Sequence, residues 1–298
     1  MRVWLVSNLL VVLLSFGVPC QMVSASEFRL GVINERTDKP DHALTQFSAL
    51  HRYLERELTP HGIGPVKLVI ADDINEMANH IGNARVDALI EGVMPTLVIK
   101  RRSVELEPTL LVWRKGQRQY HTVFFVRSDS GINSLEQLRG KSIAFEAPRS
   151  TSAYFVPRAE LLAAGIPLGA DEERNLPSDS VRYVFADSEI NQAYWVHRGR
   201  TDAGAFNNGD WDRLPTGIRK DLKIIHRTRP VVRWLFSFTP KVEMSVRQAV
   251  VEALLEAHTN DLGRKALQEA ARIKQLERLN DQDRENLNYW STVLEKSQ

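Results

Sequence analysis

The chain has 298 residues, of which 43% are hydrophobic and 26% charged, so it can bury one large core or two smaller ones. Its formal net charge of +2 gives no electrostatic reason to expect a nucleic-acid partner. Cys20 is its single cysteine, which excludes an intrachain disulfide framework. These values are typical of an ordinary globular protein.

The first 25 residues have the pattern of a secretory signal. Arg2 supplies a positive charge, an apolar stretch follows from Val3 to Val18, and residues 23–25 are the small residues of a cleavage site. We therefore predict a signal peptide at 1–25 and a mature periplasmic protein without cysteine. A lipid anchor on Cys20 is not expected, because Pro19 directly precedes it.

Strands and helices alternate along the first part of the mature chain. Short apolar runs predict strands, and apolar residues at helical spacing predict helices between them. This alternation is typical of an α/β fold with a mainly parallel sheet. The expected strands are 28–33, 66–71 and 86–90, and the expected helices surround residues 47–54 and 75–81.

The same alternation recurs later, so we expect a second α/β lobe, joined to the first by apolar strands near Val123 and Ile224. The last third is expected to be mostly helical, with an apolar stripe at 246–255 that faces the core. The expected strands of the second lobe are 122–126, 142–145, 181–185 and 202–206, and its expected helices are 134–138, 150–165 and 190–197.

Three consecutive hydroxyl residues, Ser150, Thr151 and Ser152, follow the predicted strand 142–145 and open a helix. The start of a helix has unpaired N–H groups and a partial positive charge, so it is suited to binding an anion. The hydroxyls could donate to an oxyanion. They could equally cap the helix without any ligand.

The region 121–157 resembles the phosphonate-, phosphite- and phosphate-binding periplasmic proteins of ABC importers, the PhnD-like family. Three blocks carry the resemblance in the family's order, namely DSGI at 129–132, QLRGK at 137–141 and STS at 150–152. Residues 82–88 and 199–205 are similar to the family's two G-x-VD-A and G-x-x-DAG segments. The resemblance covers essentially the whole mature chain.

The resemblance implies the type 2 periplasmic-binding-protein fold, an α/β fold of two lobes with a ligand cleft between them. Lobe 1 would comprise 27–118 and 230–298, and lobe 2 would comprise 119–229. The implied function is non-enzymatic, without cofactor or metal. The protein would capture a small oxyanion of the phosphonate, phosphite or phosphate class, through Ser150, Thr151 and Ser152, for an ABC permease, and would be a monomer.

The chain departs from the family at positions near the expected ligand. Ile74 and Glu91 stand where relatives often have tyrosines, and Glu189 stands where histidine is usual. A carboxylate beside an oxyanion is unfavourable unless it is protonated or faces a cation. Glu91 could therefore point away and pair locally. Alternatively, the ligand carries a positive group that Glu91, Glu189 or Asp202 pairs with.

Other polar and aromatic side chains have two open interpretations. Arg149 could bind an anionic ligand bidentately or remain a solvated loop residue. Arg36 and Lys39 have the same two alternatives. Tyr120 and Trp113 could line the cleft or pack in the core.

Two other functions remain open at this point. The same two-lobed fold could serve as a ligand-sensing partner of a membrane histidine kinase. A metal-dependent periplasmic hydrolase is the other alternative, although the sequence has no Walker A loop, G-x-S-x-G elbow or HExxH motif.

Overall fold

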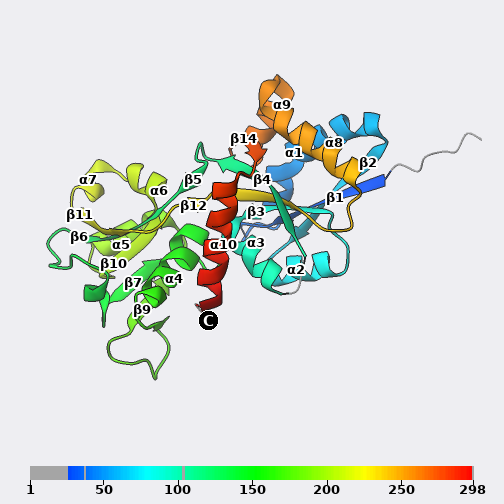
Figure 1. The fold of residues 1–298 in the computed structure, drawn as a ribbon. Coiled ribbons are helices and arrows are strands. Elements are labelled where there is room, and N and C mark those ends of the chain that lie inside the picture. Colours follow the sequence, from blue (N-terminus) through cyan, green and yellow to red (C-terminus); the bar gives the residue numbers. More distant parts are fainter. Residues whose placement is uncertain (1–25, 37, 103–104, 297–298) are drawn as a thin grey trace, which may run out of the picture.

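Residues 26–36, 38–102 and 105–296 are described by a computed structural model, which has two α/β lobes around separate six-stranded sheets (Figure 1). The first sheet has the strand order β14-β4-β13-β3-β1-β2, and the second has the order β11-β6-β10-β7-β9-β8. The predicted two-lobed α/β architecture is confirmed. The predicted signal peptide and Cys20 lie outside the described residues.

The first sheet draws strands from both ends of the chain, whereas the second uses one continuous region. The first sheet consists of β1 (Ser26–Ile33), β2 (Ile63–Ala71), β3 (Ala88–Gly92), β4 (Glu107–Arg114), β13 (Trp234–Phe238) and β14 (Ile273–Arg278). The second consists of β6 (Thr122–Arg127), β7 (Ser142–Phe145), β8 (Leu168–Ala170), β9 (Val181–Phe185), β10 (Ala203–Asn207) and β11 (Leu222–Arg227).

Helices cover both sheets. They are α1 (His42–Leu58), α2 (Ile74–Gly82), α3 (Val93–Arg101), α4 (Val156–Ala163), α5 (Glu189–His197), α6 (Asn208–Asp212), α7 (Thr216–Arg219), α8 (Met244–Glu256), α9 (Asp261–Glu269) and α10 (Asp281–Lys296). Short 3-10 turns lie at Thr59–His61, Glu136–Leu138 and Ala257–Thr259, and a π turn lies at Thr151–Phe155. Among the described residues, no helix combines the length and apolar character needed to cross a bilayer.

Most predicted elements are present, and β7 and β9 have the predicted bounds. The predicted helix at 134–138 is only a 3-10 turn. The prediction of parallel pairing is confirmed among β1, β2 and β3 and among β7, β8, β9 and β10. It does not hold for β4, β13 and β14, which pair antiparallel, or for β6 and its neighbours. The last third also contains strands that were not predicted. The strand β13 is buried along its whole length, so its sequence lacks the alternation of polar and apolar residues that reveals a half-buried strand.

The chain passes between the lobes through a two-stranded ribbon, β5 (Gln119–Tyr120) with β12 (Val231–Val232). The expected crossing strands near Val123 and Ile224 instead belong to β6 and β11 in the second sheet. Apolar composition alone could not distinguish a crossing strand from a buried sheet strand. The residue boundaries assigned to the lobes stay a prediction.

The C-terminal helix α10 lies against both lobes beside this ribbon (Figure 1). Trp290 is 0% exposed, and its indole N–H donates to the carbonyl of Pro230 at 3.1 Å. Asn286 donates to the same carbonyl at 2.7 Å. Arg118 holds Asp283 through two hydrogen bonds of 2.7 Å. The helix therefore fixes the residues on both sides of the crossing ribbon.

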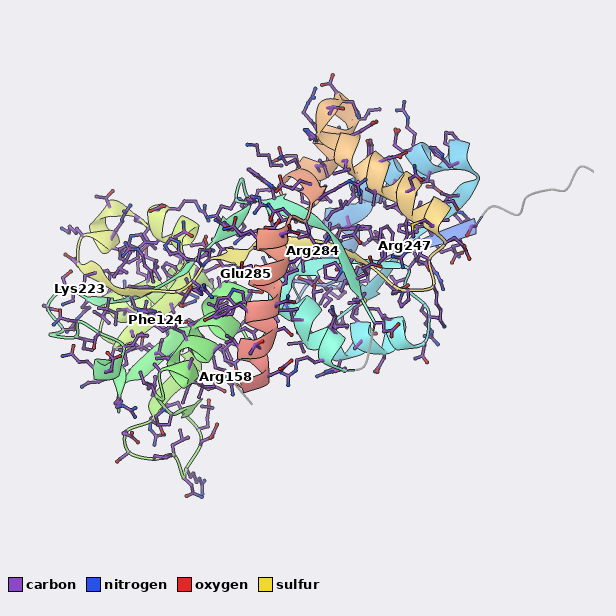
Figure 2. All side chains as sticks on the ribbon, in the orientation of Figure 1. Phe124, Arg158, Lys223, Arg247, Arg284 and Glu285 are labelled. Atoms are coloured by element: carbon purple, nitrogen blue, oxygen red, sulfur yellow. The ribbon has the colours of Figure 1, made fainter. Side chains whose placement is uncertain are left out.

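Apolar side chains fill the space between sheets and helices. Phe124, which is 0% exposed, lies in the core on one face of the second sheet, and α4, which carries Arg158, runs beside α10 (Figure 2). In α8, Val250 and Leu254 are buried in the core of the first lobe. The predicted apolar stripe therefore faces the core.

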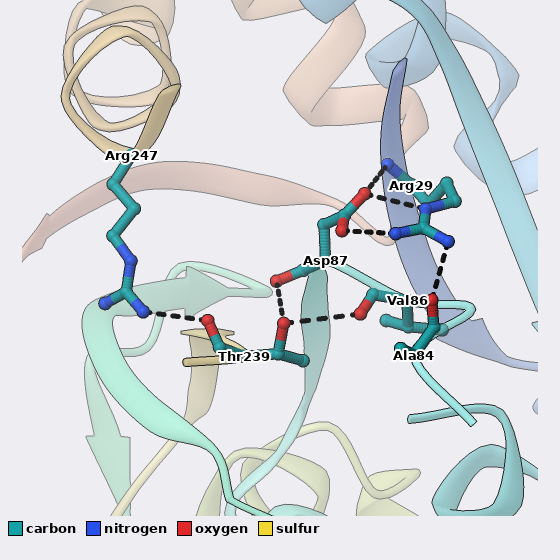
Figure 3. A network of polar contacts seen from close by, with 6 residues as sticks. All are labelled: Arg29, Ala84, Val86, Asp87, Thr239 and Arg247. Carbon is teal, nitrogen blue, oxygen red and sulfur yellow. Dashed lines mark hydrogen bonds and ion pairs between the residues drawn. The ribbon is translucent and has the colours of Figure 1, made fainter. Parts of the chain in front are cut away.

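A carboxylate at the start of β3 anchors the first sheet (Figure 3). Asp87 accepts the backbone N–H of Arg29 at 2.8 Å and two bonds from its guanidinium at 2.9 and 2.7 Å. The backbone carbonyl of Asp87 accepts the N–H of Thr239 at 2.9 Å, and Arg247 reaches the carbonyl of Thr239 at 2.8 Å. One residue therefore ties β1, β3 and the segment that follows β13.

The second lobe repeats this anchor. Asp202, just before β10, accepts the backbone N–H and the hydroxyl of Ser142, each at 2.8 Å. In both lobes the carboxylate accepts the N–H of the residue just before the first paired residue of the neighbouring parallel strand. Arg29 precedes Leu30, which pairs with Ala88, and Ser142 precedes Ile143, which pairs with Ala203. The two related D-A segments of the sequence thus have a structural role in setting strand register.

We expect Asp87→Ala to lower the free energy of unfolding by about 1–3 kcal/mol, because Arg29 and its backbone N–H lose their acceptor. Urea unfolding of the mature protein measures this change. Asp72→Ala is the matched control, since Asp72 is exposed and accepts no side-chain hydrogen bond among the described residues. Equal stability of the two variants would contradict the anchoring role.

Candidate functional site

A cavity of about 280 Å³ lies between the lobes. Its lining includes Ile33 at the end of β1, Gly92 at the end of β3, Glu146 just after β7 and Asn207 at the end of β10. In α/β sheets, ligands bind beyond the carboxyl ends of the strands, where loops present polar groups. The cavity is therefore in the position expected of a ligand site.

The hydroxyl residues Ser150, Thr151 and Ser152 all line this cavity. Ser150 is also an N-cap, because its hydroxyl accepts the N–H of Ala153 at 3.2 Å. The carbonyl of Ser152 accepts the hydroxyl of Thr122 at 2.8 Å. The segment begins as a π turn and becomes α4 at Val156. Ser150 therefore caps the helix and also lines the cavity.

Thr151 lies where the two lobes meet. A Cβ atom placed on Gly92 would be 3.3 Å from the hydroxyl of Thr151, so the absence of a side chain at Gly92 permits this close approach. Burial raises the pKa of the Tyr120 phenol to about 12, because it outweighs the charge of Arg233 and the hydrogen bond with Thr151, which both lower this pKa. Tyr120 therefore remains a hydrogen-bond donor at any physiological pH.

Arg233 is the most distinctive cation of the cavity. It is 7% exposed, and its guanidinium carbon lies 4.7 Å from the ring centroid of Tyr120. Its Nε atom is buried without a hydrogen-bond partner, and no carboxylate among the described residues forms an ion pair with it. Burial lowers the pKa of Arg233, yet an arginine stays protonated. Among the described residues, Asp210 and Glu189 therefore act on the guanidinium electrostatically without forming an ion pair with it.

Two more cations come from the end of β4. Arg114 pairs with Glu35 at 2.7 Å and lies 4.1 Å from the ring centroid of Trp234. The neighbouring Lys115 has no ion pair among the described residues. Its pKa is lowered by burial and by the charge of Arg114. These groups make one wall of the cavity cationic.

Arg149 connects the lobes directly. Its guanidinium, in the loop after β7, donates to the backbone carbonyl of Asn34, which follows β1. The sequence left open whether Arg149 faces a ligand or is a solvated loop residue. The structure disagrees with a solvated loop residue, because Arg149 lines the cavity and bonds across it to Asn34. The contact helps to hold the two lobes together over the site.

Glu91 lines the cavity and is 8% exposed. Its carboxylate accepts the N–H of Gly92 at 2.6 Å, so it also forms the local contact that the sequence left open. Burial, with a smaller effect of the nearby Glu35, raises the pKa of Glu91 to about 7. The group therefore titrates near neutral pH.

The second lobe contributes a matching pair of carboxylates, Glu146 and Glu189. Burial and the charge of Glu189 raise the pKa of Glu146 to about 7. Burial and the charge of Asp210 raise the pKa of Glu189 as well. Partial protonation of Glu146 at neutral pH reduces the repulsion that it would exert on an anionic ligand.

Several sequence-predicted residues reach the cavity and others do not. Asp202 is not among the lining residues, because it sits at the opposite end of β10 from Asn207 and holds Ser142 instead. Lys39 and Trp113 are also absent from the lining. The residues that do line it are Arg36, Ile74, Glu91, Tyr120, Arg149, Ser150, Thr151, Ser152 and Glu189.

Sequence reasoning missed Arg233, Lys115, Arg114 and Glu146. Each follows or interrupts an apolar run that forms a buried strand. A charged residue at such a position was the feature of the sequence that could have indicated a site residue. Arg233 is the clearest case, since it lies between β12 and β13, which are buried throughout. A charge at such a position is costly unless it serves a site.

The model of the ABC transporter phosphonate periplasmic substrate-binding protein family matches residues 36–284. The chain belongs to this family. Its fold also aligns with the XAC2383 protein of Xanthomonas citri bound to chloride, at 30% identity and a TM-score of 0.83, over 92% of this chain and 99% of that one. The ATP-bound form of XAC2383 aligns at 29% identity and a TM-score of 0.81, over 92% and 98% of the two chains.

A more distant structure agrees on the fold. PhnD1 of Prochlorococcus marinus in complex with methylphosphonate aligns at 17% identity and a TM-score of 0.62, over 91% of this chain and 99% of that chain. The type 2 periplasmic-binding-protein fold predicted from the sequence is thereby confirmed.

Family membership gives the general function. Members are extracytoplasmic solute-binding components of ABC transporters that work with a permease, and they are not enzymes. The prediction of a non-enzymatic binding protein is confirmed. Within the described ranges, no group of three or more His, Cys, Asp or Glu side chains is arranged to hold a metal ion.

The raised pKa of Glu91 predicts a specific pH dependence. The folded protein keeps a proton between about pH 4.5 and about pH 7 that the unfolded chain releases, so the free energy of unfolding falls as pH rises through this window. Glu91→Gln keeps an acceptor for Gly92 and removes this effect. We expect the free energy of unfolding of the variant, relative to that of the wild type, to rise by up to ~3 kcal/mol between pH 5 and pH 8.

Urea unfolding at both pH values measures the difference between variant and wild type. Because Glu146 titrates in both proteins, the comparison isolates Glu91. A constant difference across the pH range would show that Glu91 is already ionised at pH 5.

Proposed function

We propose that this protein captures a small oxyanion of the phosphonate, phosphite or phosphate class between its lobes and presents it to an ABC permease. The observation that carries this proposal is the buried guanidinium of Arg233, which forms no ion pair among the described residues, although Asp210 and Glu189 act on it electrostatically. A buried cation without a partner costs stability, whereas an oxyanion accepts its parallel N–H donors. The ligand would complete the pair.

The neighbours of Arg233 suit the same ligand. Lys115 supplies a second cation that forms no ion pair among the described residues, and Thr151 supplies a hydroxyl from the opposite lobe. A ligand held between them would draw the lobes together, in the same sense as the Arg149 bond to Asn34. The proposal is supported by the anions in the similar structures, chloride and ATP in XAC2383 and methylphosphonate in PhnD1. We propose that a monomer suffices, since both walls of the site belong to one chain.

Removal of the guanidinium tests this proposal. Arg233→Met keeps an apolar side chain against Tyr120, so we expect an unliganded protein at least as stable as the wild type. Each charge-assisted hydrogen bond contributes about 1.5–3 kcal/mol, so affinity should fall at least tenfold. Thermal unfolding with phosphate, phosphite, methylphosphonate and ATP, followed by calorimetry with the best ligand, measures both quantities.

Arg278→Met is the matched control, because Arg278 is exposed on β14 and lies outside the cavity. It should bind like the wild type. An unchanged ligand-induced shift in Arg233→Met would remove Arg233 as the anchor. The absence of any shift in the wild type would refute the proposed ligand class.

The carboxylates of the cavity raise a further question of ligand charge. Glu91 and Glu189 line the cavity, so either could pair with a positive group on the ligand, whereas Asp202 is engaged elsewhere. A ligand cation would favour the ionised form of Glu91, whose pKa is now about 7. We therefore expect 2-aminoethylphosphonate to bind about tenfold more tightly than ethylphosphonate, a difference of about 1.4 kcal/mol.

Calorimetry with both ligands measures this preference, and Glu91→Gln should reduce it. Equal affinity of the wild type for the two ligands would show that the carboxylates do not serve a ligand cation.

A further inference from the structure

A second cavity of about 640 Å³ adjoins the interlobe cavity on the side of the first lobe. The two cavities share Glu35, Arg36, Arg114 and Lys115 in their linings. Beyond these shared residues, the second cavity extends to α1 and to the turn between α9 and β14. A ligand anchored at Arg233 could therefore continue past Lys115 into this space.

The adjoining cavity has an excess of positive charge. Its lining contains four cations and two carboxylates. Arg114 pairs with Glu35, and Arg36 pairs with Asp38, so two cations remain against the single carboxylate of Glu269. Lys115 and Arg272 have no side-chain hydrogen bond or ion pair among the described residues. Unpaired cations in adjoining cavities favour a ligand whose negative charge is spread along its length.

The backbone holds these two cations next to each other. Lys115 and Arg272 both have left-handed backbone angles, with φ of 53° and 55°, which residues other than glycine seldom adopt. The N–H of Lys115 donates to the carbonyl of Arg272 at 2.9 Å, and Arg114 donates to the carbonyl of Ala271 at 3.3 Å. At Lys115 this angle belongs to a two-residue hairpin turn closed by Arg114 and Gln117, so the turn fixes where Lys115 projects.

A polar group at the far side of the cavity also lacks a partner. The Oε1 atom of Gln46, on α1, is buried without a hydrogen bond among the described residues, and Gln46 belongs to the lining. Its amide could accept from, or after rotation donate to, a polar group on a ligand.

We propose that the adjoining cavity is a second anion subsite, and that the ligand is an elongated molecule with a polyphosphate chain or two separated phosphate groups. This inference rests on the proposed function, because the first anionic group occupies the site of Arg233. Lys115 lies between the subsites and contacts both parts of the ligand. Arg272 then serves the distal group alone.

Calorimetry at constant ionic strength, without divalent cations, compares phosphate with linear tripolyphosphate. We expect tripolyphosphate to bind the wild type at least tenfold more tightly. Arg272→Ala should weaken tripolyphosphate binding about fivefold, the effect of one partly screened ion pair, and leave phosphate binding unchanged. The matched control, Arg278→Ala, removes an exposed arginine at the other end of β14 and should change neither affinity.

The outcomes separate this inference from the proposed function. Phosphate binding that depends on Arg233, together with equal tripolyphosphate affinity in Arg272→Ala and Arg278→Ala, would overturn the second subsite alone. Equal weakening of phosphate and tripolyphosphate by Arg272→Ala would also overturn it, since the residue would then act on the first site. A wild type that binds neither anion would overturn both.

Discussion

A carboxylate at the start of one strand in each lobe sets the register on which the rest of the structure depends. Asp87 receives the backbone N–H of Arg29, and Asp202 receives that of Ser142. Because these bonds fix the amino ends of adjacent parallel strands, the carboxyl ends finish together at the other edge of each sheet. The cavity lies at those carboxyl ends. A one-residue slip would turn the buried face of a strand outward and move the site residues with it.

Charge balance decides what the cavity can hold. Five cations and five carboxylates line it, yet they are not paired one to one, since Arg233 and Lys115 have no ion pair among the described residues. Meanwhile Glu91 and Glu146 have pKa values raised to about 7, so part of their negative charge is absent at neutral pH. The unliganded cavity is therefore more positive than its formal composition, which favours an anionic ligand.

The lobes are linked in a way that combines rigidity with closure. The ribbon of β5 and β12 crosses between the sheets, and α10 holds the adjacent Pro230 through Trp290 and Asn286. A further link between the lobes is the bond of Arg149 to Asn34, which joins two loops. Closure by hinge motion around a ligand is the established behaviour of periplasmic binding proteins.

The sequence by itself determined the α/β alternation, the two-lobed architecture and the hydroxyl run at residues 150–152, because local periodicity and capping chemistry depend on neighbours along the chain. It did not determine the antiparallel pairing of β13 or the true crossing ribbon, because buried strands have no distinguishing period. Tertiary structure alone brought Arg233 and Lys115 to the cavity and showed that Asp202 anchors a strand. Whether a charge is paired, buried or free depends on residues far apart in the chain, and only the fold brings those residues together.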